Sequence, residues 1–170
     1  LEVAGKGKRE SKDSKVAEGN PKSEQGATAS ERKKSSEEGG KCRILVVDDH
    51  DANLLMTQSM LHKTGRFQTE VAHDGVEAVK MASSGSYDLV LMDCNMPNMD
   101  GWCATEAIRG GDGPCKNVPV VALTANAMAG DMEYCLSRGM DDYIAKPITR
   151  VKLLEVVDRN LNVNKRASTS

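Results

Sequence analysis

The larger part of the chain alternates short apolar runs with longer stretches that have helical spacing. Three of the runs, 44–47, 89–92 and 118–123, are apolar almost throughout, which is typical of strands buried on both faces. The run 67–71 alternates apolar and polar side chains, as an edge strand with one wetter face does. A last short strand is expected at 143–145. The alternation therefore predicts an α/β chain.

Helices are expected in the gaps between these strands. Their predicted ranges are 51–64, 75–83, 100–109, 127–138 and 150–161. Five strand–helix units in succession predict a parallel sheet with right-handed crossovers and helices on both faces. The polar second strand and the short fifth strand suit the two edges. We therefore predict a single, doubly wound, five-stranded sheet of order 2-1-3-4-5.

The 170 residues suffice for one domain of ordinary size, and composition divides them unevenly. Residues 1–41 contain ten Lys or Arg, eight Asp or Glu and few large apolar side chains. Such a stretch cannot bury enough apolar surface to order itself, so we expect a disordered linker. The predicted domain spans 42–162, and 163–170 is expected to be a flexible C-terminal tail. Because the chain begins with such a linker, we expect it to be a piece of a larger protein.

Charge and cysteine content exclude several classes of protein. Residues 42–170 hold 13 basic and 17 acidic side chains, and this acidic balance argues against a nucleic-acid surface. No apolar run approaches the roughly 18 residues of a membrane span. The five cysteines show no CxxC spacing, which favours a reducing compartment. We expect a monomeric, cytoplasmic fragment without direct membrane contact, whose parent chain can still be membrane-anchored.

Polar side chains follow four of the predicted strands, and parallel strands bring their carboxyl ends to one edge of a sheet. Asp48 and Asp49 follow the first strand, Asp93 the third, Thr124 the fourth and Lys146 the fifth. Each residue taken alone could be a helix cap, a turn former or an ion-pair partner. Three carboxylates beside one ammonium group, however, repel one another unless a cation intervenes. Oxygen ligands of this kind indicate a magnesium site.

Magnesium beside Lys146 would suit a phosphoryl group, because both cations neutralise charge during an in-line transfer. Asp93 is then the candidate nucleophile, and its carboxylate would form an acyl phosphate. The Thr124 hydroxyl would donate a hydrogen bond to a phosphoryl oxygen. The predicted catalytic residues are therefore Asp93, Lys146 and Thr124.

Four motifs carry a resemblance to a known family. The segments 46–49, 91–93 with 96–101, 122–127 and 142–147 resemble, in order and in spacing, the receiver domain of two-component response regulators. The resemblance covers essentially the whole predicted domain. It implies a flavodoxin-like (βα)5 receiver fold and a phosphoacceptor in a histidine-to-aspartate phosphorelay. The chain is most similar to C-terminal receivers of hybrid histidine kinases, so the parent would be a histidine protein kinase.

The resemblance also implies how the metal is held. Asp49 and Asp93 would bind Mg²⁺ directly, with the backbone carbonyl of Asn95 as a further ligand and Mn²⁺ able to substitute. Asp48 would act largely through a bound water. At position 50, hybrid-kinase receivers usually have Asn where this chain has His50. This residue flanks the ligands, and we expect a change in tuning without loss of function.

A conformational switch is implied as well. Thr124 and Tyr143 would form the switch pair, and the Lys146–Pro147 peptide would be cis, a form that is costly except before proline. Whether the fragment counts as an enzyme stays open, since a receiver assists its own phosphorylation and dephosphorylation.

The first helix, predicted at 51–64, has apolar residues on more than one side. The family register places Met56 and Met60 against the sheet, which leaves Leu54 and Leu55 toward solvent at the mouth of the site. Two adjacent leucines there predict a docking patch for a partner helix. The expected partner is a histidine phosphotransfer domain or a histidine kinase dimerisation domain.

Three other functions compete with this one. A pseudo-receiver that serves only for binding would lack an acidic residue, the threonine or the lysine, and none is missing. A hydrolase of the haloacid dehalogenase type would need a second acid two residues after Asp93, where Asn95 stands. A stand-alone regulator is the main rival within the family, but no output domain follows the predicted domain.

Overall fold

The computed structural model describes residues 40–125 and 129–167, apart from the side chains of 129–131 and 163–167. The linker predicted for 1–41 therefore lies outside the described residues except for Gly40 and Lys41. The strands are β1 Cys42–Val47, β2 Phe67–Ala72, β3 Leu89–Asp93, β4 Val120–Thr124 and β5 Asp142–Ala145. The helices are α1 Asp51–His62, α2 Gly75–Ser84, α3 Gly101–Gly110, α4 Ala129–Ser137 and α5 Arg150–Ala167.

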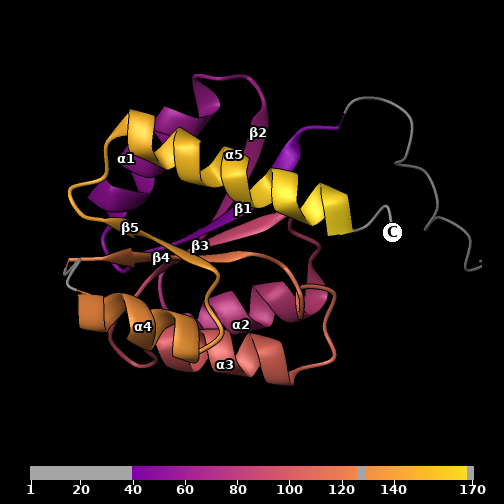
Figure 1. Ribbon diagram of the computed structural model, residues 1–170, viewed down its shortest axis with the longest axis vertical. Helices are drawn as coiled ribbons and strands as arrows, with labels where there is room; N and C mark the ends of the chain where they lie inside the picture. The colour runs from indigo at the N-terminus through magenta and orange to yellow at the C-terminus, as the bar shows by residue number, and fades with distance from the viewer. Residues whose placement is uncertain (1–39, 126–128, 168–170) are drawn as a thin grey trace, which may run out of the picture. The chain divides into compact units, whose positions relative to one another are not determined.

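All described strand pairs are parallel, and the sheet has the order β2-β1-β3-β4-β5. The predicted α/β class and strand order are thus confirmed. Figure 1 shows α1 and α5 on one face of the sheet and α2, α3 and α4 on the other. β4 begins two residues later than predicted, at Val120. Pro119, which has no amide hydrogen to donate, comes before it and accepts through its carbonyl from the Val90 amide.

Two apolar clusters fill the space between the sheet and its helices. Ile44, Leu91 and Leu153 belong to the cluster under α1 and α5. Val47 and Val90 belong to the other, under α2 and α3. Neighbouring residues of the central strands point to opposite clusters because side chains alternate along a strand. Burial on both faces explains why β1, β3 and β4 are apolar runs.

The first helix lies in a different rotational position from the one predicted. Its buried residues are Leu54, Thr57 and Leu61, which follow an i, i+3, i+7 spacing. Leu54 is 3% exposed, and Met56 is 39% exposed, so the predictions that Leu54 faces solvent and Met56 faces the sheet are wrong. Leu55 is 67% exposed, as predicted. Because the polar residue Thr57 lies at the centre of this buried stripe, the stripe is hard to recognise in the sequence.

The last helix is longer than predicted. α5 continues to Ala167, six residues beyond the predicted end of the helix at 161 and into the stretch expected to be a tail; residues 168–170 lie outside the described part of the chain. Neither proline nor glycine interrupts this stretch, so its sequence contains no helix-breaking residue. The predicted cis peptide between Lys146 and Pro147 is present.

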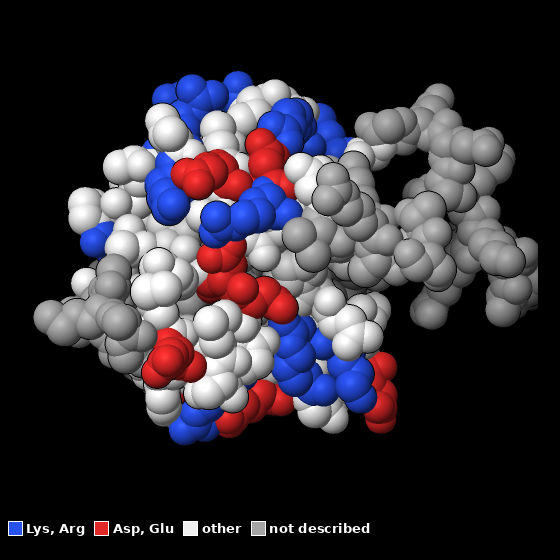
Figure 2. Space-filling view, in the orientation of Figure 1, with Lys and Arg blue, Asp and Glu red and all other residues white. Residues whose placement is uncertain are grey.

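The surface seen in Figure 2 mixes both signs of charge. Basic and acidic side chains alternate in small groups, and the described residues form no continuous basic surface on this face. None of the helices within residues 40–125 and 129–167 combines the length and the apolar character needed to cross a bilayer.

Candidate active site

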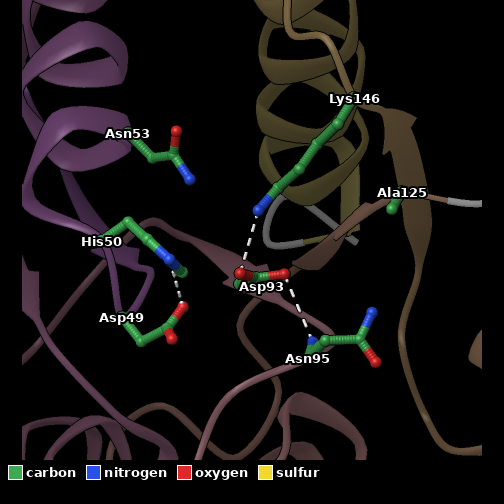
Figure 3. A pocket seen from close by; sticks show the side chains of 7 residues that line it. All are labelled: Asp49, His50, Asn53, Asp93, Asn95, Ala125 and Lys146. Atoms are coloured by element: carbon green, nitrogen blue, oxygen red, sulfur yellow. Dashed lines mark hydrogen bonds and ion pairs between the residues drawn. The ribbon is translucent and has the colours of Figure 1, made fainter.

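Three charged side chains meet where β1, β3 and β5 end. Asp48 directly follows β1, Asp93 is the last residue of β3, and Lys146 directly follows β5. The Lys146 Nζ lies 2.9 Å from Asp48 Oδ2 and 2.9 Å from Asp93 Oδ2. Figure 3 shows the lysine reaching down from the end of β5 to the Asp93 carboxylate. One ammonium group thus bridges carboxylates from two different strands.

Both bridged carboxylates are buried, yet their pKa values move in opposite directions. Burial raises the pKa of Asp48, but hydrogen bonds from Lys146, from the Asn53 side chain and from the His50 amide outweigh it, so the net pKa is lowered. For Asp93 burial is again the largest effect, and the Lys146 hydrogen bond does not offset it, so the net pKa is raised. The difference arises because Asp48 has more donors around it.

The first turn of α1 supplies these extra donors. Asn53 Nδ2 donates to Asp48 Oδ1 at 2.9 Å and to Oδ2 at 3.1 Å, and the His50 amide donates to Oδ1 at 3.0 Å. Asp48 is therefore a satisfied, buried group that anchors Lys146. Asn53 was missed by the sequence analysis. Its position three residues after the helix N-cap, on the side facing the sheet, is the signal that could have found it.

Asp49 and His50 stand at the edge of the same site. The Asp49 carboxylate is 21% exposed, and its Oδ1 lies 2.8 Å from His50 Nδ1. Potential ligand atoms of Asp48, Asp49 and His50 all lie within 4.8 Å of one another. The site thus offers an imidazole nitrogen in addition to the predicted carboxylates.

A cavity of about 210 Å³ opens above these groups. Its lining residues are Asp49, His50, Asn53, Asp93, Asn95, Ala125 and Lys146. Figure 3 shows the side chains of Asp49, Asp93 and Lys146 converging on this space. Since a water molecule occupies roughly 30 Å³ in the liquid, the cavity has room for an ion with several waters.

Not every predicted site residue lines the cavity. Asp48 is 1% exposed and lies beneath it, and Thr124 is buried at the end of β4, one residue before the lining residue Ala125. Tyr143, on β5, is partly buried and packs against the apolar cluster under α2 and α3. Asn95 does line the cavity, and its amide donates to Asp93 Oδ1 at 3.3 Å.

The donor set fits a divalent cation. Asp49 and Asp93 present carboxylate oxygens to the cavity, and Lys146 is the cation that faces them there. With Asp48 included, the side-chain charge is that of three carboxylates against one ammonium group, which leaves an excess of negative charge. Hard oxygen donors with space for water suit Mg²⁺.

Fold and site together place the chain in a family. A strand order of 2-1-3-4-5 with an acidic cleft at the carboxyl ends of β1 and β3 is the architecture of phosphoacceptor receivers. Residues 44–158 match the response regulator receiver domain, and the chain belongs to this family. The resemblance inferred from the four sequence motifs is confirmed.

Several curated relatives are sensor kinases. The sensor protein GacS of Pseudomonas syringae pv. syringae is 45% identical over 117 residues, which are 68% of this chain and 13% of that protein. Histidine kinase 5 of Arabidopsis thaliana is 35% identical over 150 residues, 74% of this chain and 16% of that protein. The chain therefore spans a small part of the relatives it matches.

Solved structures give the same fold. The receiver domain of a sensor histidine kinase from Pseudomonas aeruginosa PAO1 is 40% identical, with a TM-score of 0.66, and the match covers 72% of this chain and 99% of that one. That structure has a magnesium ion coordinated in its active-site cleft. The chemotaxis protein CheY4 of Vibrio cholerae, at 27% identity, also has a TM-score of 0.66, over 71% of this chain and 99% of its own.

Proposed function

We propose that Asp93 accepts a phosphoryl group from a phosphohistidine. The observation that carries this proposal is the position of its carboxylate, which is buried, borders the cavity and is held by Lys146 at 2.9 Å. Burial leaves the carboxylate poorly solvated, which its raised pKa reflects. A poorly solvated anion fixed in one orientation is suited to act as a nucleophile.

In the proposed reaction, an Asp93 carboxylate oxygen attacks phosphorus in line with the phosphohistidine nitrogen. A P–O bond forms as the P–N bond breaks, and the electron pair of the broken bond returns to the imidazole, which takes up a proton from solvent. Lys146 stays in place as the positive charge beside the acyl phosphate. Asp48 holds Lys146 there and is positioned in turn by Asn53.

For the metal, we propose Asp49, Asp93 and the Asn95 carbonyl as direct ligands and Asp48 as an indirect one. Bound Mg²⁺, or Mn²⁺ in its place, would neutralise charge on the transferring phosphoryl group. Support comes from the excess of carboxylates around the cavity and from the magnesium ion in the related Pseudomonas receiver. With few protein ligands and several retained waters, we expect millimolar-scale affinity for Mg²⁺.

Labelling with acetyl phosphate and Mg²⁺ tests this function. We expect Asp93→Asn to abolish acid-labile labelling and Asp49→Ala to remove Mg²⁺ binding, measured by the change in Trp102 fluorescence. Asp88→Asn is the matched control, because Asp88 precedes the same strand at its opposite end and accepts from the Arg43 amide at 2.7 Å. Stoichiometric labelling of Asp93→Asn, or loss of labelling in Asp88→Asn, would contradict the proposal.

We further propose that Thr124 and Tyr143 form the conformational switch. Thr124 ends β4 beside the cavity-lining Ala125, and Tyr143 pairs with Ala122 across β4 and β5, so one strand pair connects the cavity to Tyr143. Beryllofluoride with Mg²⁺, as a phosphoryl mimic, should shift the amide resonances around Tyr143 as well as those around Asp93. Shifts confined to the surroundings of Asp93 would refute the switch.

We propose a partner helix that docks on α1, now with Leu55 and Met56 as its contacts in place of the buried Leu54. Both residues are exposed and follow the cavity-lining Asn53 by two and three positions. A helical histidine phosphotransfer domain, or a kinase dimerisation domain, would bring its imidazole to Asp93 from this side. The relatives support this partner class, since they include hybrid and sensor histidine kinases.

Leu55→Ala should slow transfer from a phosphotransfer domain several-fold while leaving labelling by acetyl phosphate nearly unchanged. Leu136→Ala is the control, since Leu136 is 52% exposed on α4, which covers the other face of the sheet. Equal effects of the two substitutions would argue against docking on α1.

Finally, we propose that the chain is the receiver part of a hybrid histidine kinase and works as a monomeric unit in the cytoplasm. The proposal is supported by relatives of which the chain matches only 13% or 16%. Gel filtration with light scattering would test the monomer, and a dimer at micromolar concentration would contradict it.

A further inference from the structure

We propose that His50 is a metal ligand and makes this cleft prefer a nitrogen-binding first-row transition ion, such as Co²⁺ or Ni²⁺, over Mg²⁺. The inference rests on the proposed metal site and adds to it a nitrogen donor and a preference among ions. It revises the expectation that His50 only flanks the ligands.

The geometry around Asp49 supports coordination by His50. Adjacent ligand atoms of an octahedral ion are about 3 Å apart when each lies about 2.1 Å from the ion. His50 Nδ1 lies 2.8 Å from Asp49 Oδ1 and 3.7 Å from Asp48 Oδ1. The first separation suits two neighbouring ligands of one ion, and Figure 3 shows the ring directed at the Asp49 carboxylate on the cavity side. Without a metal this contact is a hydrogen bond in which Nδ1–H donates to the Asp49 carboxylate; coordination would replace that proton with the ion and use the tautomer that carries its proton on Nε2.

Among the residues that the structure describes, the hydrogen bond and ion pairs of the His50 imidazole are all with the carboxylates of Asp48 and Asp49. His50 is the N-cap residue of α1, yet its side chain makes no capping hydrogen bond. The side chain is 70% exposed, so it is free of the packing that would explain a histidine in an apolar core. Its ring contacts carboxylates on both preceding residues, which is where a cation is needed.

Donor chemistry then fixes the direction of the preference. Mg²⁺ favours oxygen ligands, whereas imidazole nitrogen suits transition ions, whose affinity rises from Mn²⁺ through Co²⁺ to Ni²⁺. A cleft with carboxylates alone binds both kinds of ion through oxygen. Adding one nitrogen favours the transition ion selectively.

The test compares Co²⁺, Mn²⁺ and Mg²⁺ binding to the whole chain by calorimetry. We expect His50→Asn to lower the ratio of Co²⁺ to Mg²⁺ affinity about tenfold, because the loss of a nitrogen ligand weakens Co²⁺ binding while the oxygen ligands that Mg²⁺ uses remain. In the Co²⁺-loaded wild type, a paramagnetically shifted imidazole N–H signal should appear, and it should vanish in His50→Asn. Asparagine is a preferred N-cap, so this variant should fold.

The matched control is His73→Asn. His73 Nδ1 lies 3.4 Å from Asp51 Oδ1, so it is also an exposed histidine beside a carboxylate, but it does not line the cavity. This substitution should leave the ratio and the shifted signal unchanged.

Three results would overturn the inference. An unchanged ratio in His50→Asn would mean that the ring is not a ligand. A parallel fall in Co²⁺ and Mg²⁺ affinity would mean that it only orients Asp49. If Asp49→Ala still binds Mg²⁺, the proposed metal site is wrong as well. If Asp49→Ala loses Mg²⁺ binding but His50→Asn leaves the affinity ratio unchanged, only the histidine ligand is wrong.

Discussion

Carboxylates at the two ends of the sheet are paired with basic side chains in different ways. At the amino end, Arg109 pairs with Asp141 at 2.8 Å, and Arg159 pairs with Asp142 at 2.6 Å. Asp141 also accepts from the Val120 amide, which ties it to the start of β4. Each of these carboxylates has its own guanidinium group.

At the carboxyl end, by contrast, Asp48 and Asp93 share the one ammonium group of Lys146, and Asp49 meets only a histidine among the described residues. These two carboxylates at the amino end are therefore neutralised within the fold, while the carboxyl end carries an excess of negative charge that a ligand can neutralise. Charge left unbalanced in this way costs stability and is characteristic of functional sites.

The largest expected effect separates the two kinds of ion pair. Lys146→Met leaves two buried carboxylates without their cation, so we expect it to destabilise the metal-free domain by about 3 kcal/mol. Arg159→Met removes a half-exposed guanidinium and leaves Asp142 with its hydrogen bond from Asn160, so it should cost only about 1 kcal/mol. Urea denaturation of both variants measures the difference. Equal losses would show that the two ends do not differ.

Neutralising Asp93, at the carboxyl end of the sheet, and Glu70, within β2, should change stability in opposite directions. Burial raises the pKa of Asp93, so its charge opposes folding at neutral pH, and Asp93→Asn should stabilise the metal-free domain by about 1 kcal/mol. Hydrogen bonds from Arg43 and Tyr87 lower the pKa of Glu70, so Glu70→Gln should destabilise the domain, by less than about 1 kcal/mol because this pair is partly screened by solvent. Thermal melting without divalent ions tests both signs, and destabilisation by Asp93→Asn would contradict the account.

The smallest effect concerns Tyr87, whose hydroxyl donates to Glu70 Oε2 at 2.7 Å. Burial and this hydrogen bond raise the pKa of Tyr87 from 10.0 to about 12. The unfolded chain then loses its proton first, so the contribution is complete below pH 10 and is lost as the pH rises toward 12. Tyr87→Phe should cost about 0.5–1 kcal/mol at neutral pH and should flatten this alkaline decline. An identical alkaline decline in both proteins would sink the assignment.

Much of this architecture could be predicted because the signals are strong and local. Strands buried on both faces must be apolar throughout, which made β1, β3 and β4 visible. Because the strands are parallel, Asp93 and Lys146 could be predicted to lie at the same edge of the sheet before their contact was known. The predicted convergence of these two residues and Asp48 is confirmed.

What could not be predicted depends on tertiary packing. The sequence of α1 has two apolar sides, and either could have packed against the sheet. The structure buries the side that contains Leu54, together with the polar Thr57. Asn53 escaped notice because an asparagine in a first helical turn has no periodic signature. The end of α5 was misplaced because residues 163–167 are polar enough to suggest a tail yet contain no helix-breaking residue.

The most direct test of the central claim is to locate the phosphoryl group itself. The chain is treated with acetyl phosphate and Mg²⁺, the acyl phosphate is trapped by borohydride reduction, and the modified peptide is sequenced by mass spectrometry. We predict a single Mg²⁺-dependent modification at Asp93, at the carboxyl end of β3. Modification at Asp48 or Asp49 instead, or equal modification without Mg²⁺, would contradict it.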